Sequence, residues 1–103
     1  MIVEMRSYVL LPGKLPEFMR LMGTEGIAIE QRVLGRMLGF YSTEIGAINK
    51  VIHLWAYDSF EDRQCRRAQL AAHPEWAAFV LKVLPLIQDM NNEILNPAPF
   101  SPQ

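Results

Sequence analysis

The chain has 103 residues and only one cysteine, Cys65, so it cannot form an internal disulfide bond. It has no excess of one charge, because ten lysine and arginine residues face eleven acidic residues. No apolar run approaches the roughly 20 residues that a membrane helix needs. We therefore expect a reducing, cytoplasmic location, no membrane insertion and no nucleic-acid partner. Glu4 and Arg6 interrupt the apolar start of the chain, unlike a signal or transit peptide.

The length and composition predict one folded domain. Half of the residues are hydrophobic and 20% are charged, a balance typical of a globular protein and not of a disordered one. Residues 1–96 would form the core of a single domain spanning residues 1–103. Three prolines (Pro97, Pro99 and Pro102) predict an extended tail over residues 97–103.

Hydrophobic periodicity predicts the order β-α-β-β-α-β. Residues 2–10, 37–44, 49–57 and 86–95 carry strand patterns, and the middle two are joined by a glycine-containing hairpin loop. Helical spacing runs from residue 14 to Gly35, where Gly23 and Gly26 favour a break into two segments. Ser59 is a candidate N-cap for a second helix, which Pro74 divides and Pro85 ends. This order is typical of an α+β ferredoxin-like sandwich.

Both faces of the predicted sheet carry bulky side chains, which implies that both are covered. We expect the helices to cover the face formed by Val3, Met5, Leu38, Phe40, Ile52 and Leu54. The opposite face would then carry Tyr8, Tyr41, Val51, His53, Trp55, Tyr57 and Met90. An exposed patch with so many aromatic side chains is uncommon on a free monomer. A second copy of the same face would cover it. We therefore expect a homodimer.

Several motifs resemble the NIPSNAP family along almost the whole chain. They are Arg6-Ser7-Tyr8 with Pro12-Gly13-Lys14, the hairpin from Gly39 through Tyr41-Ser42-Thr43-Glu44-Ile45-Gly46 to Asn49, His53-Leu54-Trp55-Ala56-Tyr57 with Arg63, Arg67 and Pro74-Glu75-Trp76, and the ending Ile94-Leu95-Asn96-Pro97 with Phe100-Ser101-Pro102. The resemblance implies a dimeric α/β barrel, in which two sheets face each other around a small interior. It implies little about activity, because a shared fold hosts many functions.

The candidate site combines residues of two neighbouring strands. Alternation predicts that Arg6, Tyr8, His53, Trp55 and Tyr57 all point to the barrel-facing side, where they could bind a planar or anionic small molecule. His53 could act there as a general acid or base. The alternative is that these side chains fill the dimer interface, with Arg6 paired to an acidic neighbour such as Glu4 or Glu44.

Three further residues complete the predicted ligand-binding set. Tyr41 lies on the same predicted face. Arg63 and Arg67 share a helix face and could contact an anion at the pocket mouth, or else remain solvated in local ion pairs. No metal or cofactor is expected, because the two histidines and Cys65 lack ligand spacing.

Two functions remain open from the sequence. The first is a dimer without catalysis that binds a small molecule or a protein partner. The second is a cofactor-independent oxygenase or isomerase acting on a small aromatic or carbonyl compound inside the barrel. An interior cavity of about 300 Å³ or more beside His53 would favour the enzyme, and a filled interior would favour the binding protein.

Overall fold

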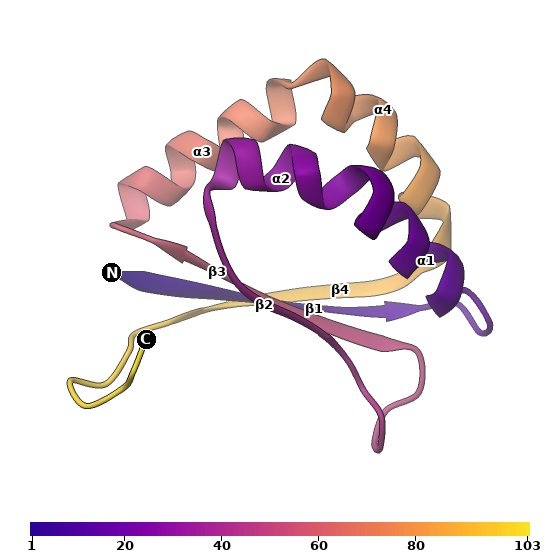
Figure 1. Ribbon diagram of the computed structural model, residues 1–103, viewed down its shortest axis with the longest axis horizontal. Helices are drawn as coiled ribbons and strands as arrows, with labels where there is room; N and C mark the ends of the chain where they lie inside the picture. The colour runs from indigo at the N-terminus through magenta and orange to yellow at the C-terminus, as the bar shows by residue number, and fades with distance from the viewer.

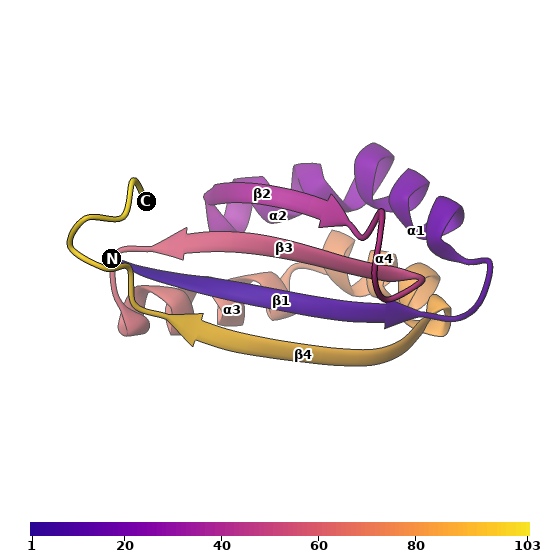
Figure 2. The same cartoon turned by 90° about the horizontal axis from the view of Figure 1, so that it is seen from below.

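The computed structural model describes residues 1–103 and consists of two layers, with all helices on one face of a four-stranded antiparallel sheet (Figure 1). The strand order is β2-β3-β1-β4 (Figure 2). The elements in chain order are β1 (Ile2–Leu10), α1 (Leu15–Leu21), η1 (Met22–Gly26), α2 (Ile27–Leu34), β2 (Arg36–Ser42), β3 (Lys50–Tyr57), α3 (Phe60–Ala72), α4 (Pro74–Val83), η2 (Leu84–Leu86) and β4 (Ile87–Leu95). The predicted α+β class and element order are confirmed.

The break predicted in the first helix is a five-residue π-helical turn, η1. Gly26 is required within it because a Cβ atom at this position would lie 2.6 Å from the ring of Phe79 on α4. Gly23 meets no such neighbour. Gly35 ends α2 with a φ of +91°, a backbone conformation that glycine adopts without strain. The close approach at Gly26 therefore joins the two halves of the helical layer.

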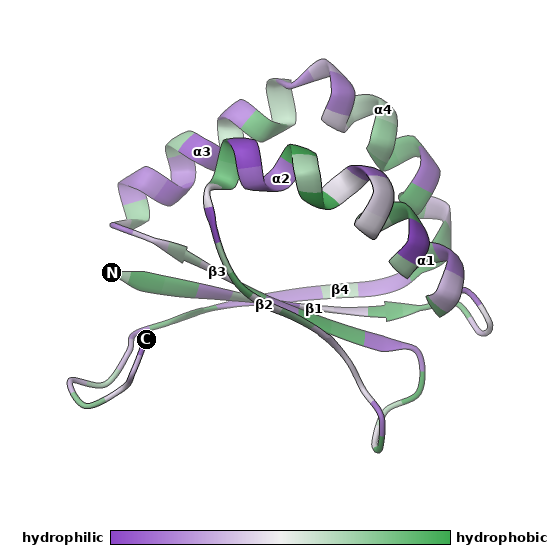
Figure 3. Ribbon diagram, viewed as in Figure 1, coloured by the Kyte–Doolittle hydropathy of each residue, from purple (hydrophilic) through white to green (hydrophobic).

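The second helical region is also divided as predicted. The Ser59 side chain accepts a hydrogen bond from the backbone N–H of Asp62, which starts α3. Pro74 opens α4, and His73 before it is extended, as the residue before a proline should be. In Figure 3 the ribbon of α3 is mostly hydrophilic, whereas that of α4 carries more hydrophobic residues. The helical layer therefore places the more hydrophilic α3 over one end of the sheet and the more hydrophobic α4 over the other.

The prediction of which sheet face the helices cover is wrong. Trp55, His53 and Val51 are almost completely buried under the helices, and Tyr8 packs edge-on against Phe18 of α1. The predicted helix-covered set lies on the opposite face, with one exception: Phe40 stacks against His53 and packs against Phe18. Alternation had separated the two faces, but the helices cover the more aromatic and more highly charged one.

Register places the residues of the candidate site side by side across the central strands. Arg6 lies opposite His53 on β3 and Asn92 on β4. The register of the pairing between β2 and β3 shifts by one residue of β2 between Met37 and Gly39. Because of this irregularity Phe40 lies opposite His53, on the helix side, while Tyr41 points to the uncovered side.

The tail after β4 differs from the expected extended chain. It turns at Pro99 and Phe100, where the Ser101 N–H donates to the Ala98 carbonyl oxygen at 2.9 Å. The turned tail lies beside the uncovered sheet face, and the two together line a groove of about 510 Å³. No helix is long and apolar enough to span a membrane.

Candidate functional site

Seven of the eight predicted ligand-binding residues converge between the sheet and the helices. They are Arg6, Tyr8, His53, Trp55, Tyr57, Arg63 and Arg67. They therefore do not face a partner molecule across the open side of the sheet, as the sequence had suggested. Tyr41 is the exception, since it lies on the uncovered face with 55% of its surface exposed. We call the layer between sheet and helices in which these seven side chains lie the inner chamber.

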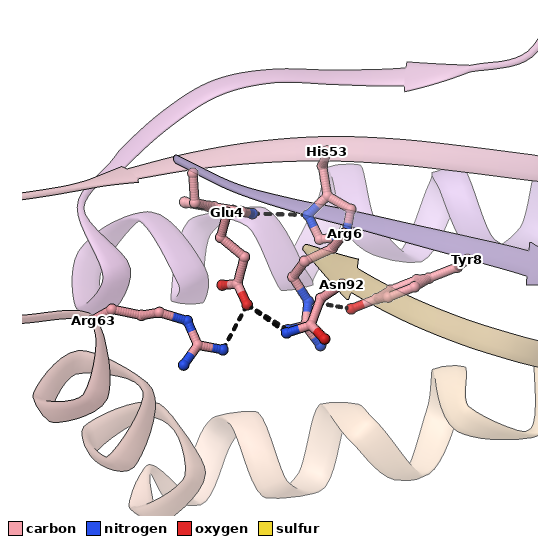
Figure 4. Close-up of polar contacts among 7 residues, drawn as sticks. Glu4, Arg6, Tyr8, His53, Arg63 and Asn92 are labelled. Carbon is pink, nitrogen blue, oxygen red and sulfur yellow. Dashed lines mark hydrogen bonds and ion pairs between the residues drawn. The ribbon is translucent and has the colours of Figure 1, made fainter. Parts of the chain in front are cut away.

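A single carboxylate oxygen organises one end of the inner chamber (Figure 4). Glu4 is fully buried on β1, and its Oε2 accepts hydrogen bonds from Arg63 at 2.6 Å, Asn92 at 2.9 Å and Arg6 at 3.2 Å. Burial alone would raise the pKa of Glu4, but these donors and the two positive charges outweigh it and lower the pKa to about 2. Glu4 is therefore ionised, and it holds strands β1 and β4 and helix α3 together.

Arg6 links this cluster to the middle of the chamber. Its Nε donates to the Tyr8 hydroxyl oxygen at 2.9 Å while Nη1 contacts Glu4. Burial raises the pKa of the Tyr8 hydroxyl, and the nearby Arg6 charge opposes this only in part. The pairing of Arg6 with Glu4 that the sequence offered as an alternative is present.

His53 has a defined hydrogen-bonding state. The indole N–H of Trp55 can only donate, and it donates to His53 Nδ1 at 2.8 Å. Burial, together with the charges of Arg6 and Arg67, lowers the pKa of His53 to about 3. The ring is therefore neutral with its hydrogen on Nε2, a buried atom that has no partner within the chain. His53 thus offers a fixed hydrogen-bond donor, a different role from the general acid or base expected from the sequence.

Glu30 on α2 was not among the residues predicted for the site. This carboxyl is 2% exposed, and its Oε1 has no hydrogen-bond partner. Burial raises its pKa to about 7, although the charges of Arg67 and Arg6 act in the opposite direction. A signal was present, because Glu30 lies three residues after Ile27 and four before Leu34, on the apolar face of the helix.

A small cavity joins Glu30 and His53. It measures about 70 Å³ and is lined by Tyr8, Phe18, Met22, Glu30, His53, Trp76, Val80, Val83, Leu84, Ile87 and Met90. Leu84 and Met90 are partly exposed, which places them at the rim toward solvent. The volume is well below the ~300 Å³ that would favour an enzyme enclosing a whole aromatic substrate. It would hold about two water molecules, or the polar end of a larger molecule.

Several other buried polar atoms in the chamber also lack partners. The donors are Arg63 Nε, Arg67 Nη1, His53 Nε2 and the Tyr57 hydroxyl, and the acceptors are Glu4 Oε1 and Glu30 Oε1. Native proteins rarely leave buried polar groups unpaired. With three arginines against the ionised Glu4 and a Glu30 that is only partly ionised near neutral pH, the chamber favours an occupant that accepts hydrogen bonds and carries partial or full negative charge.

The other candidates contribute little to this site. Arg66 pairs with Asp62 on the same helix at 3.0 Å. Cys65 is exposed. No group of three or more histidine, cysteine, aspartate or glutamate side chains lies close enough to hold a metal ion. Phe79 is buried in the core, and the centre of its ring lies 5.4 Å from that of the partly buried Trp76.

Comparison with known sequences identifies one family. A family model described as NIPSNAP matches residues 3–102. Protein NipSnap of Drosophila melanogaster is 36% identical over 101 residues, covering 98% of this chain and 36% of its own length. Human Protein NipSnap homolog 3A is 35% identical over 99 residues, covering 94% of this chain and 39% of its own length. The chain thus spans little more than a third of these two relatives.

Solved structures give the same result. An uncharacterised NIPSNAP-like domain protein of Burkholderia xenovorans is 50% identical with a TM-score of 0.96, covering 99% of this chain and 89% of that one. A NIPSNAP family protein of Agrobacterium tumefaciens is 44% identical with the same TM-score, covering 98% and 96%. A Nitrosomonas europaea protein provisionally assigned as an antibiotic biosynthesis monooxygenase has a TM-score of 0.69 at 9% identity, covering 93% and 97%. This last likeness shows the fold alone.

Proposed function

Because this chain belongs to the NIPSNAP family, we propose that it is a homodimeric binding protein whose protomers each hold the polar end of a small molecule in the inner chamber. The two chains pair through their uncovered sheet faces to form a dimeric α/β barrel. The observation that carries the binding function is the pair of buried, unpartnered polar atoms, His53 Nε2 and Glu30 Oε1, on side chains that line one cavity.

The uncovered sheet face supports the dimer. Figure 2 shows the sheet from this side, with every helix behind it. The apolar side chains on this face come from all four strands and are Val3, Met5, Leu38, Ile52, Leu54 and Leu95. The loop between β2 and β3 adds Ile45 and Ile48, which are 94% and 82% exposed. Apolar side chains gathered on a sheet face that no helix covers are typical of a protein interface, and two-fold pairing covers both copies at once.

The dimer is tested by measuring mass in solution. Light scattering on a size-exclusion column should give about 24 kDa, twice the 11.8 kDa of one chain. Leu54→Lys should lower this mass toward one chain, because the lysine charge would be buried at the centre of the interface. Leu81→Lys on the exposed side of α4 is the matched control and should remain dimeric. A folded wild-type protein of 11.8 kDa at tens of micromolar concentration would overturn the dimer.

The surplus of donors and positive charge supports a ligand with an anionic or carbonyl end. The charge of Arg67 acts on the pKa values of Glu30, His53, Tyr8 and Tyr57. Hydrogen bonds to charged donors are stronger than those between neutral groups, so the unpartnered Arg67 Nη1 and Arg63 Nε are stronger unmatched donors than His53 Nε2 or the Tyr57 hydroxyl.

Binding is tested by thermal shift with small carboxylates, aromatic acids, quinones and haem. A small carboxylate should raise the melting temperature of the wild type, and Arg67→Met should abolish this rise. Arg32→Met removes an exposed arginine that pairs with Glu75 on the surface, and it should leave the rise unchanged. The absence of any shift with every compound of the set would overturn the binding function.

A second function has one observation in its favour. An isomerase needs a group that exchanges protons near neutral pH, and Glu30 is a buried carboxyl of that kind. The small cavity argues against an oxygenase that encloses a whole aromatic ring, because its volume is about half of the ~150 Å³ of a cavity known to bind benzene.

A further inference from the structure

The two functional groups of the cavity have complementary chemistry. His53 presents an N–H that is fixed by Trp55 and does not titrate near neutrality. Glu30 presents a carboxyl that lacks any hydrogen bond at Oε1. The remaining cavity walls are apolar except for Tyr8, whose hydroxyl already accepts from Arg6. The cavity therefore pairs one fixed donor with one group that can take or release a proton.

We propose that Glu30 is the catalytic base of this cavity and that its substrate is a small carbonyl compound with an acidic C–H bond next to the carbonyl group. This inference rests on the proposed binding function and adds a reaction to it. It also transfers the acid–base role from His53, where the sequence suggested it, to a residue on α2.

The reaction is a reversible proton transfer. The Glu30 carboxylate removes the proton from the carbon next to the carbonyl, and the electron pair of the broken C–H bond forms a carbon–carbon double bond. The carbonyl electrons move onto oxygen, which accepts a hydrogen bond from His53 Nε2. The protonated Glu30 then returns a proton to the same carbon while the carbonyl double bond re-forms, so atoms and electrons balance without an oxidant or cofactor.

The charges around Glu30 favour this step. Arg67 from α3 and Arg6 from β1 act on both Glu30 and His53, and they would stabilise the negative charge that develops on the substrate oxygen. Glu4 on β1 opposes them, but its Oε2 is occupied by three donors. Burial raises the pKa of Glu30 to about 7, so both of its protonation states are present near neutral pH. From α4 only apolar side chains line the cavity.

The size of the cavity limits the substrate. About 70 Å³ holds a carbonyl group and its neighbouring carbon, and the rest of the molecule would extend past Leu84 and Met90 at the rim. Pyruvate is a suitable probe, because it joins an enolisable methyl ketone to a carboxylate that the arginines can attract.

Proton NMR of pyruvate in D₂O tests the inference, because loss of the methyl signal measures exchange for deuterium. The wild type should accelerate exchange above the buffer rate, and the acceleration should rise with pH up to about 7 as Glu30 ionises. Glu30→Gln should reduce the acceleration by about 100-fold or more, within the range for loss of an acid–base group. Glu17→Gln on the surface of α1 is the control and should exchange like the wild type.

Binding is measured separately, by saturation-transfer NMR on the same samples. Pyruvate that binds to wild type and Glu30→Gln, but exchanges only with wild type, supports the inference. Binding without accelerated exchange, or equal exchange by both proteins, overturns it and leaves the binding function standing. If pyruvate and the other small carboxylates all fail to bind, the proposed function and this inference both fall.

Discussion

Trp55 and His53, two residues apart on β3, point to the same side of the sheet and are joined by a hydrogen bond of 2.8 Å from the indole N–H to Nδ1. The imidazole is further held between two rings. Phe40 stacks on it with 4.6 Å between ring centres, and Tyr8 meets it edge-on with 5.0 Å between ring centres. The orientation and the tautomer of His53 are therefore both set by neighbours that cannot themselves change charge near neutral pH.

The first prediction concerns this tautomer. We expect His53 to stay neutral with its hydrogen on Nε2 from pH 5 to pH 8, because its pKa lies at about 3. Long-range ¹⁵N–¹H NMR of the imidazole measures the tautomer directly, and His73→Gln removes the signals of the only other histidine. Trp55→Phe should release Nδ1 and give a mixture of tautomers. A wild-type His53 that titrates between pH 5 and pH 8 would contradict this prediction.

A second prediction concerns the buried ion pair of Glu4 and Arg63. Arg63→Met should lower the free energy of unfolding at pH 7 by about 3–5 kcal/mol, because it removes one partner of a buried charge. Arg32→Met, which breaks an exposed pair, should cost at most about 1 kcal/mol. Urea denaturation measures both values.

The same pair has a pH dependence. Because folding lowers the pKa of Glu4 from 4.5 to about 2, its contribution is complete above pH 4.5 and is lost as the pH falls toward 2. The double variant Glu4→Gln with Arg63→Met should be less sensitive to pH over this window than the wild type. Equal acid sensitivity of the two proteins would show that other carboxyl groups carry the effect.

The raised pKa of Glu30 predicts that stability changes with pH in the opposite direction, at higher pH. Folding raises its pKa from 4.5 to about 7, so the folded chain holds a proton that the unfolded chain releases in this window. Stability should therefore fall as the pH rises from 4.5 to 7, by about 3 kcal/mol from this group alone. Glu30→Gln should remove the loss and be more stable than the wild type at pH 8. Unfolding curves at a series of pH values check this, and a variant with the wild-type slope would refute it.

The last prediction compares two glycines of one π-helical turn. Gly23→Ala should stabilise the protein by about 0.5–1 kcal/mol, because the new methyl group meets open space and the unfolded chain loses freedom. Gly26→Ala should destabilise it by about 1–3 kcal/mol, because the methyl group would press on the Phe79 ring and the Met22 sulfur. Thermal unfolding distinguishes the two, and equal effects would show that η1 and α4 do not pack this closely.

Local patterns determined the secondary structure of this protein. Residues 2–10 alternate as a strand and form β1 with the same bounds, and Ser59 and Pro74 start helices α3 and α4 where their chemistry requires. These features depend on neighbours along the chain, which the sequence displays. The separation of residues into two sheet faces follows from the same local rule.

The identity of the covered face could not be obtained in this way. A period of two assigns Glu4, His53 and Trp55 to one side, but it does not say on which side the helices lie. Hydrophobicity was a poor guide, because both faces are bulky and the covered one contains Glu4 and Arg6. The deciding contact joins Glu4 to Arg63, 59 residues apart, and is visible only once α3 is placed.

Glu30 shows the same limit within the site. Its helical position could have marked it as inward-facing, but its lack of a partner depends on β1, β3, α3 and α4 together. The sequence by itself thus determined the elements, their order and which side chains share a face. Only the tertiary structure decided which face is buried and which carboxyl is left unpaired, because both depend on charges brought together from distant parts of the chain.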